Sequence, residues 1–475
     1  MVPEEIRKIE RPKNTIVQVT KKADVYLVVQ RIGCRYDNGR RLPVNGKVIG
    51  HIIDGRYVPK EESNTKLSQR NFHVLKYGCA AFADKMGAEL YRQLKEVFHP
   101  DDARDIYCLA LIRTSFPETK DYQARDRYEK SWISHLYPGA RLSKNDVCDL
   151  LFNIGKSYDL VVGFMRKRVE ELIKEGTRVL IDGMLKSNTS NVNSFSGFSY
   201  KGRIKGTKDI SIIAAVDAEK KEPICMKVYK GSMPDTSNFT DFIQEFSIKG
   251  GIEIGDKAFT FEKMQQYKDG KVGFLHPLKR SSKKSDELGL ASLMVPLRTE
   301  DQVIMAAKKE EAGLYYYLFR DEKRAAKEEA DFIRKKDPSS FDSADYKKRR
   351  DQFGTICFVS NCDFLAKDVY DYYALRWEIE TVFRMYKGIL SLNTTRVHDD
   401  CSVIGTEFVN YLSSIITCKM KSVVKEQGLF KDYTLRDIIG RLSDMIMVTT
   451  DPKAGKWDIC NLSKSDLKLK EALGV

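Results

Sequence analysis

The chain has 475 residues, of which 42% are hydrophobic, so it is long enough for roughly two to four domains with cores of their own. Its 81 Lys and Arg outnumber its 67 Asp and Glu, which leaves a formal net charge of +14. This excess favours a polyanionic partner and salt-dependent binding. The sequence shows no signal peptide and no apolar stretch of membrane length, so we expect a cytoplasmic protein that does not contact a membrane.

Several kinds of catalytic site are excluded by the motifs that the sequence lacks. The six histidines form no H-E-x-x-H pair, and the ten cysteines have no zinc-finger spacing, so we expect reduced thiols. Gly155-Lys156-Ser157 resembles the end of a phosphate-binding loop, but Leu150 stands where that motif requires glycine. No G-x-S-x-G or G-x-G-x-x-G motif is present.

The N-terminal part of the chain changes from strand-like to helical. Residues 1–62 alternate in DVYLVVQRIG and GKVIGHIIDGRYVPK, and Asp-Asn-Gly and Asn-Gly are turn signals. Residues 63–175 have helical periodicity, and Ser143 or Asn145 is expected to cap the helix in RLSKNDVCDLLFNIG. We therefore predict a strand-rich module followed by a helical region.

Residues 176–278 predict an α/β arrangement of the order β-β-β-α-β-α-β-α, which continues after residue 355. The predicted strands are short apolar runs that are bounded by Gly, Asp and Pro. Asp182 follows the first run, RVLI, and Asp256 ends the fourth, GIEIGDKAF. Asp217 also ends a strand, but we interpret it as a turn residue.

Residues 279–355 exceed what a minimal α/β core needs between its last strands. They contain possible strands in ASLMVPLR, QVIMAAKKE and GLYYYLFR, and a charged helix, so we predict a β-rich insertion. A strand, TICFVSN, begins at Thr355 and returns the chain from the insertion to the core. Residues 356–420 complete the core and carry its last helix, and residues 421–475 form a helical tail.

One predicted helix carries four polar side chains at regular offsets. Tyr373, Arg376, Glu380 and Lys387 lie at offsets of 0, 3, 7 and 14. At about 100° per residue they would share an arc of about 60°. A carboxylate between two cations suits a site where a metal meets a phosphate. The alternative is a solvated helix face with i, i+4 ion pairs.

The arrangement Y-x2-R-x3-E-x6-K resembles the signature of DDE transposases of bacterial insertion sequences, in the branch that moves by cut and paste. The resemblance implies a ribonuclease H-like catalytic core in which Asp182, Asp256 and Glu380 bind two Mg²⁺ ions, with Mn²⁺ able to substitute. It also implies that the DNA-binding residues are Tyr373, Arg376, Lys387 and Trp377. Tyr373, Arg376 and Lys387 would contact phosphates, whereas Trp377 would either stack on a displaced base or belong to the core.

The resemblance further implies the partners of the protein. These are double-stranded DNA, as terminal inverted repeats and as target, and a second copy of the chain in the DNA complex. Residues 63–175 would recognise the ends or form a scaffold, and residues 279–355 would hold DNA near the active site or form a decorating subdomain. We expect a bacterial or archaeal protein associated with the nucleoid.

Two other functions remain open from the sequence. One is a ribonuclease H-like nuclease that cleaves without strand transfer, which gives no reason for the full Y-R-E-K set. The other is a non-catalytic DNA-binding protein derived from a transposase, against which the three acids argue.

Overall fold

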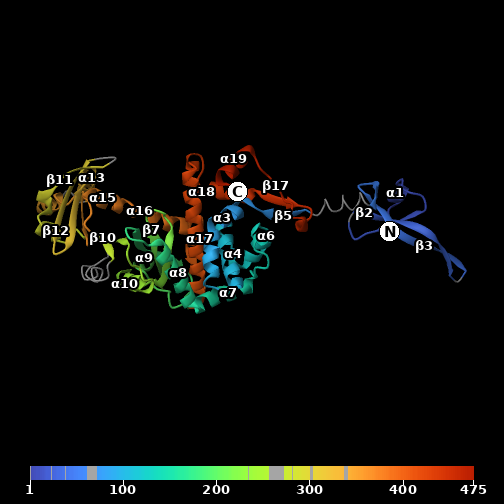
Figure 1. Cartoon of the computed structure of the whole chain (residues 1–475), viewed down its shortest axis with the longest axis horizontal. Coiled ribbons are helices and arrows are strands. Elements are labelled where there is room, and N and C mark those ends of the chain that lie inside the picture. Colours follow the sequence, from blue (N-terminus) through green and yellow to red (C-terminus); the bar gives the residue numbers. More distant parts are fainter. Residues whose placement is uncertain are drawn as a thin grey trace. The chain divides into compact units, whose positions relative to one another are not determined.

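A computed structural model describes the chain except for residues 1, 23, 38, 61–71, 234, 256–271, 281, 300–302 and 336–340 (Figure 1). The chain forms two compact units. One comprises Met1–Leu75 and Ile446–Leu462, and the other comprises Lys76–Met445 and Ser463–Val475. Among the described residues, none of the helices combines the length and the apolar composition needed to cross a membrane.

The first unit contains an antiparallel sheet in the order β1-β2-β3-β4 and a second, three-stranded sheet in the order β17-β16-β5. The strands are β1 (Thr15–Val19), β2 (Val25–Asp37), β3 (Arg40–Ile53), β4 (Arg56–Pro59), β5 (His73–Lys76), β16 (Ile446–Thr449) and β17 (Asp458–Cys460). Val17, Val28 and Ile52 form its core, against which Ile6 of α1 (Glu4–Lys8) packs. The strands predicted within residues 1–62 are confirmed where the structure describes them. The prediction that residues 421–475 are a helical tail is wrong in part, because β16 and β17 lie within them and pair with each other.

The two turn signals in this sheet have different outcomes. Strand β2 ends at Asp37 and β3 begins at Arg40, after Gly39, as the first signal predicted, although Asn38 lies outside the described residues; Asn45 and Gly46, in contrast, lie within β3. Asn45 is paired with Arg31 of β2 where the register between the two strands is irregular. The Asn-Gly signal therefore coincides with a local distortion within β3 and not with a turn. Asp54 and Gly55, with φ of 53° and 73°, make the next turn.

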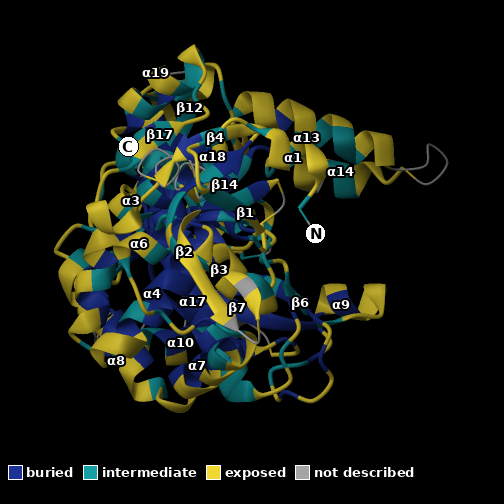
Figure 2. Cartoon of the chain, turned by 90° about the vertical axis from the view of Figure 1, so that its right-hand side faces the viewer, coloured by how far each residue is buried: buried dark blue, intermediate teal, exposed yellow. Residues whose placement is uncertain are grey.

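Helices in the second unit surround one long central helix, α17 (Asp400–Glu426), which is largely buried (Figure 2). The helices that contact it are α3 (Gly78–Lys95), α4 (Pro100–Ser115) and α7 (Lys144–Lys156). Ser143 caps α7, as one of the two predicted caps, in a reciprocal pair with Asp146. The remaining helices of this region are α5 (Ala124–Glu129), α6 (Ile133–Leu136) and α8 (Tyr158–Leu172).

The second unit also contains one large mixed sheet, in the order β11-β12-β13-β14-β10-β9-β6-β7-β8. Strands β6, β9 and β10 are parallel to one another, whereas β6 with β7 and β7 with β8 are antiparallel. The strands at this end are β6 (Arg178–Asn188), β7 (Lys208–Asp217), β8 (Pro223–Lys230), β9 (Ile252–Ile254) and β10 (Gly273–Pro277). Nine consecutive residues of β7 are buried, so both faces of the sheet are covered there.

The strands predicted between residues 279 and 355 extend the same sheet. Strands β11 (Val295–Arg298), β12 (Val303–Glu311) and β13 (Leu314–Arg320) join it through β14 (Thr355–Ser360), which pairs with β10. The predicted charged helix is α13 (Glu322–Lys335), followed by α14 (Ser343–Arg350). The helix that the predicted order places after the fourth strand falls on residues 261–268, which lie outside the described residues.

The prediction of a single regular helix is wrong for the segment that carries Tyr373, Arg376, Glu380 and Lys387. The chain instead forms α15 (Ala366–Ala374), α16 (Trp377–Arg384) and a π-helical turn, η4 (Met385–Ile389). Between α15 and α16 the backbone bonds tighten, because the amides of Arg376 and Glu378 donate to carbonyls three residues back at 3.1 and 2.8 Å. A tightened turn and a widened π turn do not keep 100° per residue, so the calculated arc does not apply.

Candidate active site

Asp182 lies in the middle of β6, opposite Ala214 of β7, and not at the end of a strand as predicted. The strand continues to Asn188 because β7 pairs with it along its whole length. The side chain of Asp182 is 21% exposed, and its Oδ1 accepts a hydrogen bond from the amide of Gly183 at 2.8 Å. A carboxylate in a buried strand is therefore held rigidly and remains open to solvent.

The chain after β14 approaches Asp182. Arg376, at the N-terminus of α16, has its guanidinium 4.0 Å from Oδ2 of Asp182. Both side chains are about one fifth exposed, so the pair lies at the edge of the core. The structure thus brings Asp182, the first predicted acid, close to Arg376, a residue predicted to bind phosphate, although the two are 194 positions apart in the chain.

Glu380 lies on α16, which contacts β6. Ile379 and Val382 bury the inner face of this helix, and Glu378 is fastened to Lys221 at 2.5 Å. Glu380 itself is half-buried, and its carboxylate makes no hydrogen bond or ion pair with another described residue.

Asp256 lies outside the described residues. The preceding strand, β9, is in parallel register with β6, so that its last residue, Ile254, is opposite Leu180. Among the described residues, no group of three or more His, Cys, Asp or Glu side chains is placed to hold a metal ion.

Lys387 lies in η4 and is half-buried. Burial lowers its pKa, and the nearby Lys201 lowers the pKa further. A partly desolvated ammonium beside other cations gains from an anionic ligand, which would restore its charge balance.

A buried polar network that the sequence analysis missed supports η4. Lys186, on β6, is 1% exposed and contacts Oε1 of Glu407 on α17 at 2.6 Å. The hydroxyl of Tyr386, the neighbour of Lys387, donates to the same carboxylate, and Asn410 donates to Oε2 at 3.3 Å. Burial lowers the pKa of Lys186, which Glu407 opposes. The signal in the sequence was a lysine four residues after Asp182, on the same face of an apolar strand.

The two aromatic residues have different surroundings. The Tyr373 ring packs edge-on against Phe358, with centroids 4.7 Å apart, and is half-buried. Trp377 is 66% exposed, so of the two alternatives for this residue the core is excluded, and its DNA-binding role stays a prediction. Asp217, in contrast, is a turn residue as predicted, because its Oδ1 accepts from the amides of Glu219 and Lys220, each at 2.9 Å.

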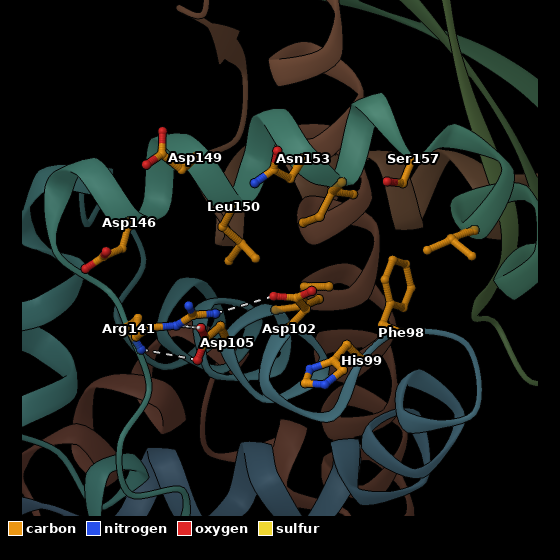
Figure 3. Close-up of a pocket in the computed structure, with 13 residues that line it drawn as sticks. Phe98, His99, Asp102, Asp105, Arg141, Asp146, Asp149, Leu150, Asn153 and Ser157 are labelled. Carbon is orange, nitrogen blue, oxygen red and sulfur yellow. Dashed lines mark hydrogen bonds and ion pairs between the residues drawn. The ribbon is translucent and has the colours of Figure 1, made fainter.

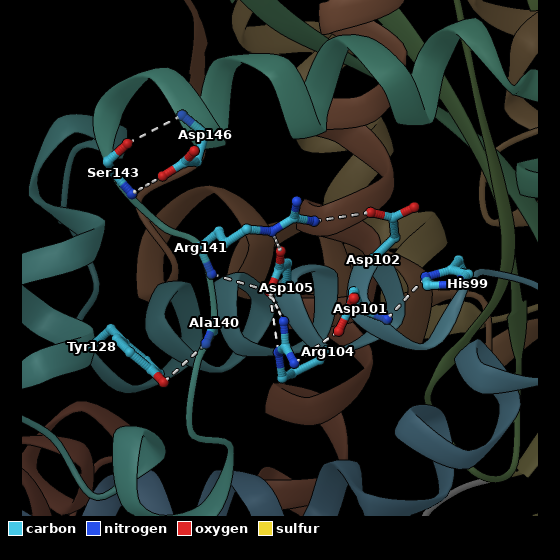
Figure 4. Close-up of polar contacts among 10 residues, drawn as sticks. All are labelled: His99, Asp101, Asp102, Arg104, Asp105, Tyr128, Ala140, Arg141, Ser143 and Asp146. Carbon is cyan, nitrogen blue, oxygen red and sulfur yellow. Dashed lines mark hydrogen bonds and ion pairs between the residues drawn. The ribbon is translucent and has the colours of Figure 1, made fainter.

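A pocket of about 390 Å³ lies between α4 and α7 in the helical region (Figure 3). Four aspartates and one arginine line it: Asp102, Asp105, Asp146, Asp149 and Arg141. Arg141 binds Asp105 at 3.0 Å and Asp102 at 3.4 Å, and burial raises the pKa of Asp105 (Figure 4). This acidic surface is unsuited to phosphate groups.

Residues 173–402 match the family model described as "Transposase DDE domain". The match includes Asp182, Asp256, Glu380 and the segments that surround them. It supports a DDE-type transposase, with DNA as its partner and DNA transposition as its function. Enzymes of this type generally use divalent metal ions.

Other comparisons add little to that match. The cryo-EM structure of the piggyBac transposase synaptic complex with hairpin DNA is similar to this chain with a TM-score of 0.41 and 12% identity. The similarity covers 79% of this chain and 76% of that chain. No curated protein matches this chain.

Proposed function

We propose that this protein is a cut-and-paste transposase of a bacterial insertion sequence, in which Asp182, Asp256 and Glu380 form the catalytic triad. The observation that carries the proposal is the meeting of β6 and α16, with Arg376 4.0 Å from Asp182 and Glu380 on the same helix. This meeting joins an acid of the core to the predicted Y-R-E-K segment.

The strand order supports a ribonuclease H-like core. Strands β8-β7-β6-β9-β10 have the order 3-2-1-4-5 when they are renumbered along the chain, and only β7 is antiparallel to both of its neighbours. Leu180 and Ile254 are in register, and each precedes a proposed catalytic aspartate by two residues. This correspondence supports Asp182 and Asp256 as a pair.

The donor set fits a hard divalent cation such as Mg²⁺, because carboxylate oxygens from contacting elements are the ligands that such ions prefer. Glu380 meets this requirement, since no described residue occupies its carboxylate. Two bound Mg²⁺ ions would supply activation of the attacking hydroxyl and neutralisation of the leaving oxygen.

The protein's own side chains would position the DNA. Arg376 is placed to bind a phosphate next to Asp182, and its planar fork suits two phosphate oxygens. Lys387 would bind a second phosphate, and Tyr373 would direct its hydroxyl to a third. Trp377 is exposed and available to stack on a displaced base. Because transposition joins two ends, we also propose a homodimer in the DNA complex.

The test uses purified protein and a duplex that carries the inverted repeats flanking its gene. We expect Asp182→Asn, Asp256→Asn and Glu380→Gln each to abolish cleavage while binding to the ends persists. The matched controls are Asp217→Asn, on the strand that pairs with the strand of Asp182, and Glu378→Gln, on the same helix as Glu380, and both should cleave. Normal cleavage by a triad variant would remove that residue from the triad, and cleavage without joining to target DNA would favour the nuclease.

A further inference from the structure

The connection between β6 and β7 exposes apolar side chains that the proposed chemistry does not use. It contains the short helix α9 (Tyr200–Lys205), in which Tyr200 is 81% exposed and Ile204 is 74% exposed. Spacings of three and four residues place Tyr200, Arg203 and Ile204 on one side of the helix, here called the α9 outer face. In Figure 2 most of α9 has the yellow of exposed residues.

The inner side of α9 is packed and bonded to β7. Ser199 caps the helix by accepting from the amide of Gly202 at 2.8 Å, and its hydroxyl donates to the buried carboxylate of Asp209. A Cβ on Gly202 would lie 2.7 Å from Oδ2 of Asp209 on β7, so only glycine allows the helix to approach this strand so closely. The α9 outer face is therefore held outward by the fold.

The same connection is fastened to the chain just after Lys387. The side-chain amide of Asn193 donates to the carbonyl of Val397 at 2.9 Å, and the amide of Ser194 donates to Asp400 at 2.7 Å. The amide of Thr189 donates to the carbonyl of Thr395 at 3.0 Å. The connection thus bridges the strand of Asp182 and the segment that follows Lys387.

The charge around α9 is positive. Lys201, Arg203 and Lys205 are exposed, and none of them forms an ion pair with another described residue. Lys201 is also close enough to Lys387 to lower its pKa, although burial lowers that pKa more. Lys201 of α9 therefore lies within electrostatic range of the proposed phosphate site at Lys387.

We propose that the α9 outer face binds a DNA duplex next to the active site, with Arg203 on a phosphate and Tyr200 and Ile204 against the sugars and base edges. This inference rests on the proposed function. Charge complementarity favours DNA over a second copy of the chain, because the three cations of α9, which have no ion-pair partner among the described residues, would have to be desolvated in a protein interface. Exposed apolar side chains among cations match the way proteins hold and deform DNA.

The test measures binding of the full-length protein to end-containing and random duplexes over a range of salt concentrations. Tyr200→Ala should weaken binding about tenfold without changing the salt dependence, because an aromatic contact with a base is neutral. Arg203→Gln should reduce the slope of log affinity against log salt by about one. Controls are Leu467→Ala and Lys468→Gln, a neighbouring apolar and cationic pair on α19 (Lys464–Leu473), which should bind as wild type does.

Each outcome separates this inference from the proposed function. If Tyr200→Ala and Arg203→Gln bind both duplexes as tightly as the controls, the inference is wrong, even if cleavage that depends on Asp182 persists. If they weaken binding while the wild type cleaves no DNA under any metal condition, the surface stands and the transposase proposal fails. A variant that changes the mass in sedimentation but not the DNA affinity would instead assign the α9 outer face to a second copy.

Discussion

Replacing Lys186 by methionine should destabilise the second unit strongly. The lysine and its partner Glu407 are 1% and 2% exposed, and Nζ lies 2.6 Å from Oε1. Methionine keeps most of the length of the side chain but removes the ammonium. The Glu407 carboxylate would then be buried with hydrogen-bond donors from Tyr386 and Asn410 and without a cation.

The expected cost is about 3–5 kcal/mol, which is the usual effect of removing one partner from a buried ion pair. Against a total stability of about 5–15 kcal/mol, this is a large fraction. An exposed pair provides the contrast. Arg125 and Glu129 are 66% and 54% exposed, so Arg125→Met should leave the free energy of unfolding nearly unchanged, because solvent screens such a pair. Lys186→Met combined with Glu407→Met should recover part of the loss, because no unpaired charge then remains.

The assay is equilibrium unfolding in urea, followed by far-ultraviolet circular dichroism, for the single variants, the double variant and Arg125→Met. DNA cleavage should also fall in Lys186→Met under folded conditions, since Tyr386 precedes Lys387 in η4. If Lys186→Met lowers the free energy of unfolding by less than about 1 kcal/mol, the reasoning is refuted, because burying a carboxylate without its cation should cost more than that. A double variant as unstable as the sum of the singles would show that the two residues are not coupled.

The remaining predictions concern the proposed DNA chemistry. Arg376→Ala and Lys387→Ala should each remove a charge-assisted contact worth about 1.5–3 kcal/mol and slow cleavage of correct ends by up to about a hundredfold. Equal losses on end-containing and random duplexes would argue against this role. Because burial lowers the pKa of Lys387, its phosphate contact should be present at neutral pH and be lost as the pH rises through that lowered value. In binding assays, Lys387→Arg should keep its affinity at alkaline pH where the wild type loses it, and parallel pH profiles would contradict the assignment. Chelation of divalent ions should stop cleavage, Mg²⁺ or Mn²⁺ should restore it, and Ca²⁺ should support binding without turnover. Full activity in EDTA would exclude the metal mechanism.

The strands around Asp182 were predictable because their signal is local. A short apolar run with turn residues at both ends is typical of a buried strand. Strands β7, β8, β12 and β13 lie where such runs predicted them. The cap of α7 was similarly local, since Ser143 bonds a residue three positions away. Trp377 was not predictable, because the same aromatic residue suits a core or a surface, and only the packing of α16 leaves it 66% exposed.

The sequence by itself determined the order of the elements, the residue types of the proposed triad and the resemblance that connects them, because each depends on neighbours along the chain. Only the tertiary structure decided that Asp182 lies within β6, that the Y-R-E-K segment is divided among α15, α16 and η4, and that Lys186 is paired with Glu407, 221 positions away. These outcomes depend on strand pairing and burial between distant segments. The free energy of such contacts depends on which polar and apolar groups from distant segments are buried against each other. A local sequence pattern does not specify those partners.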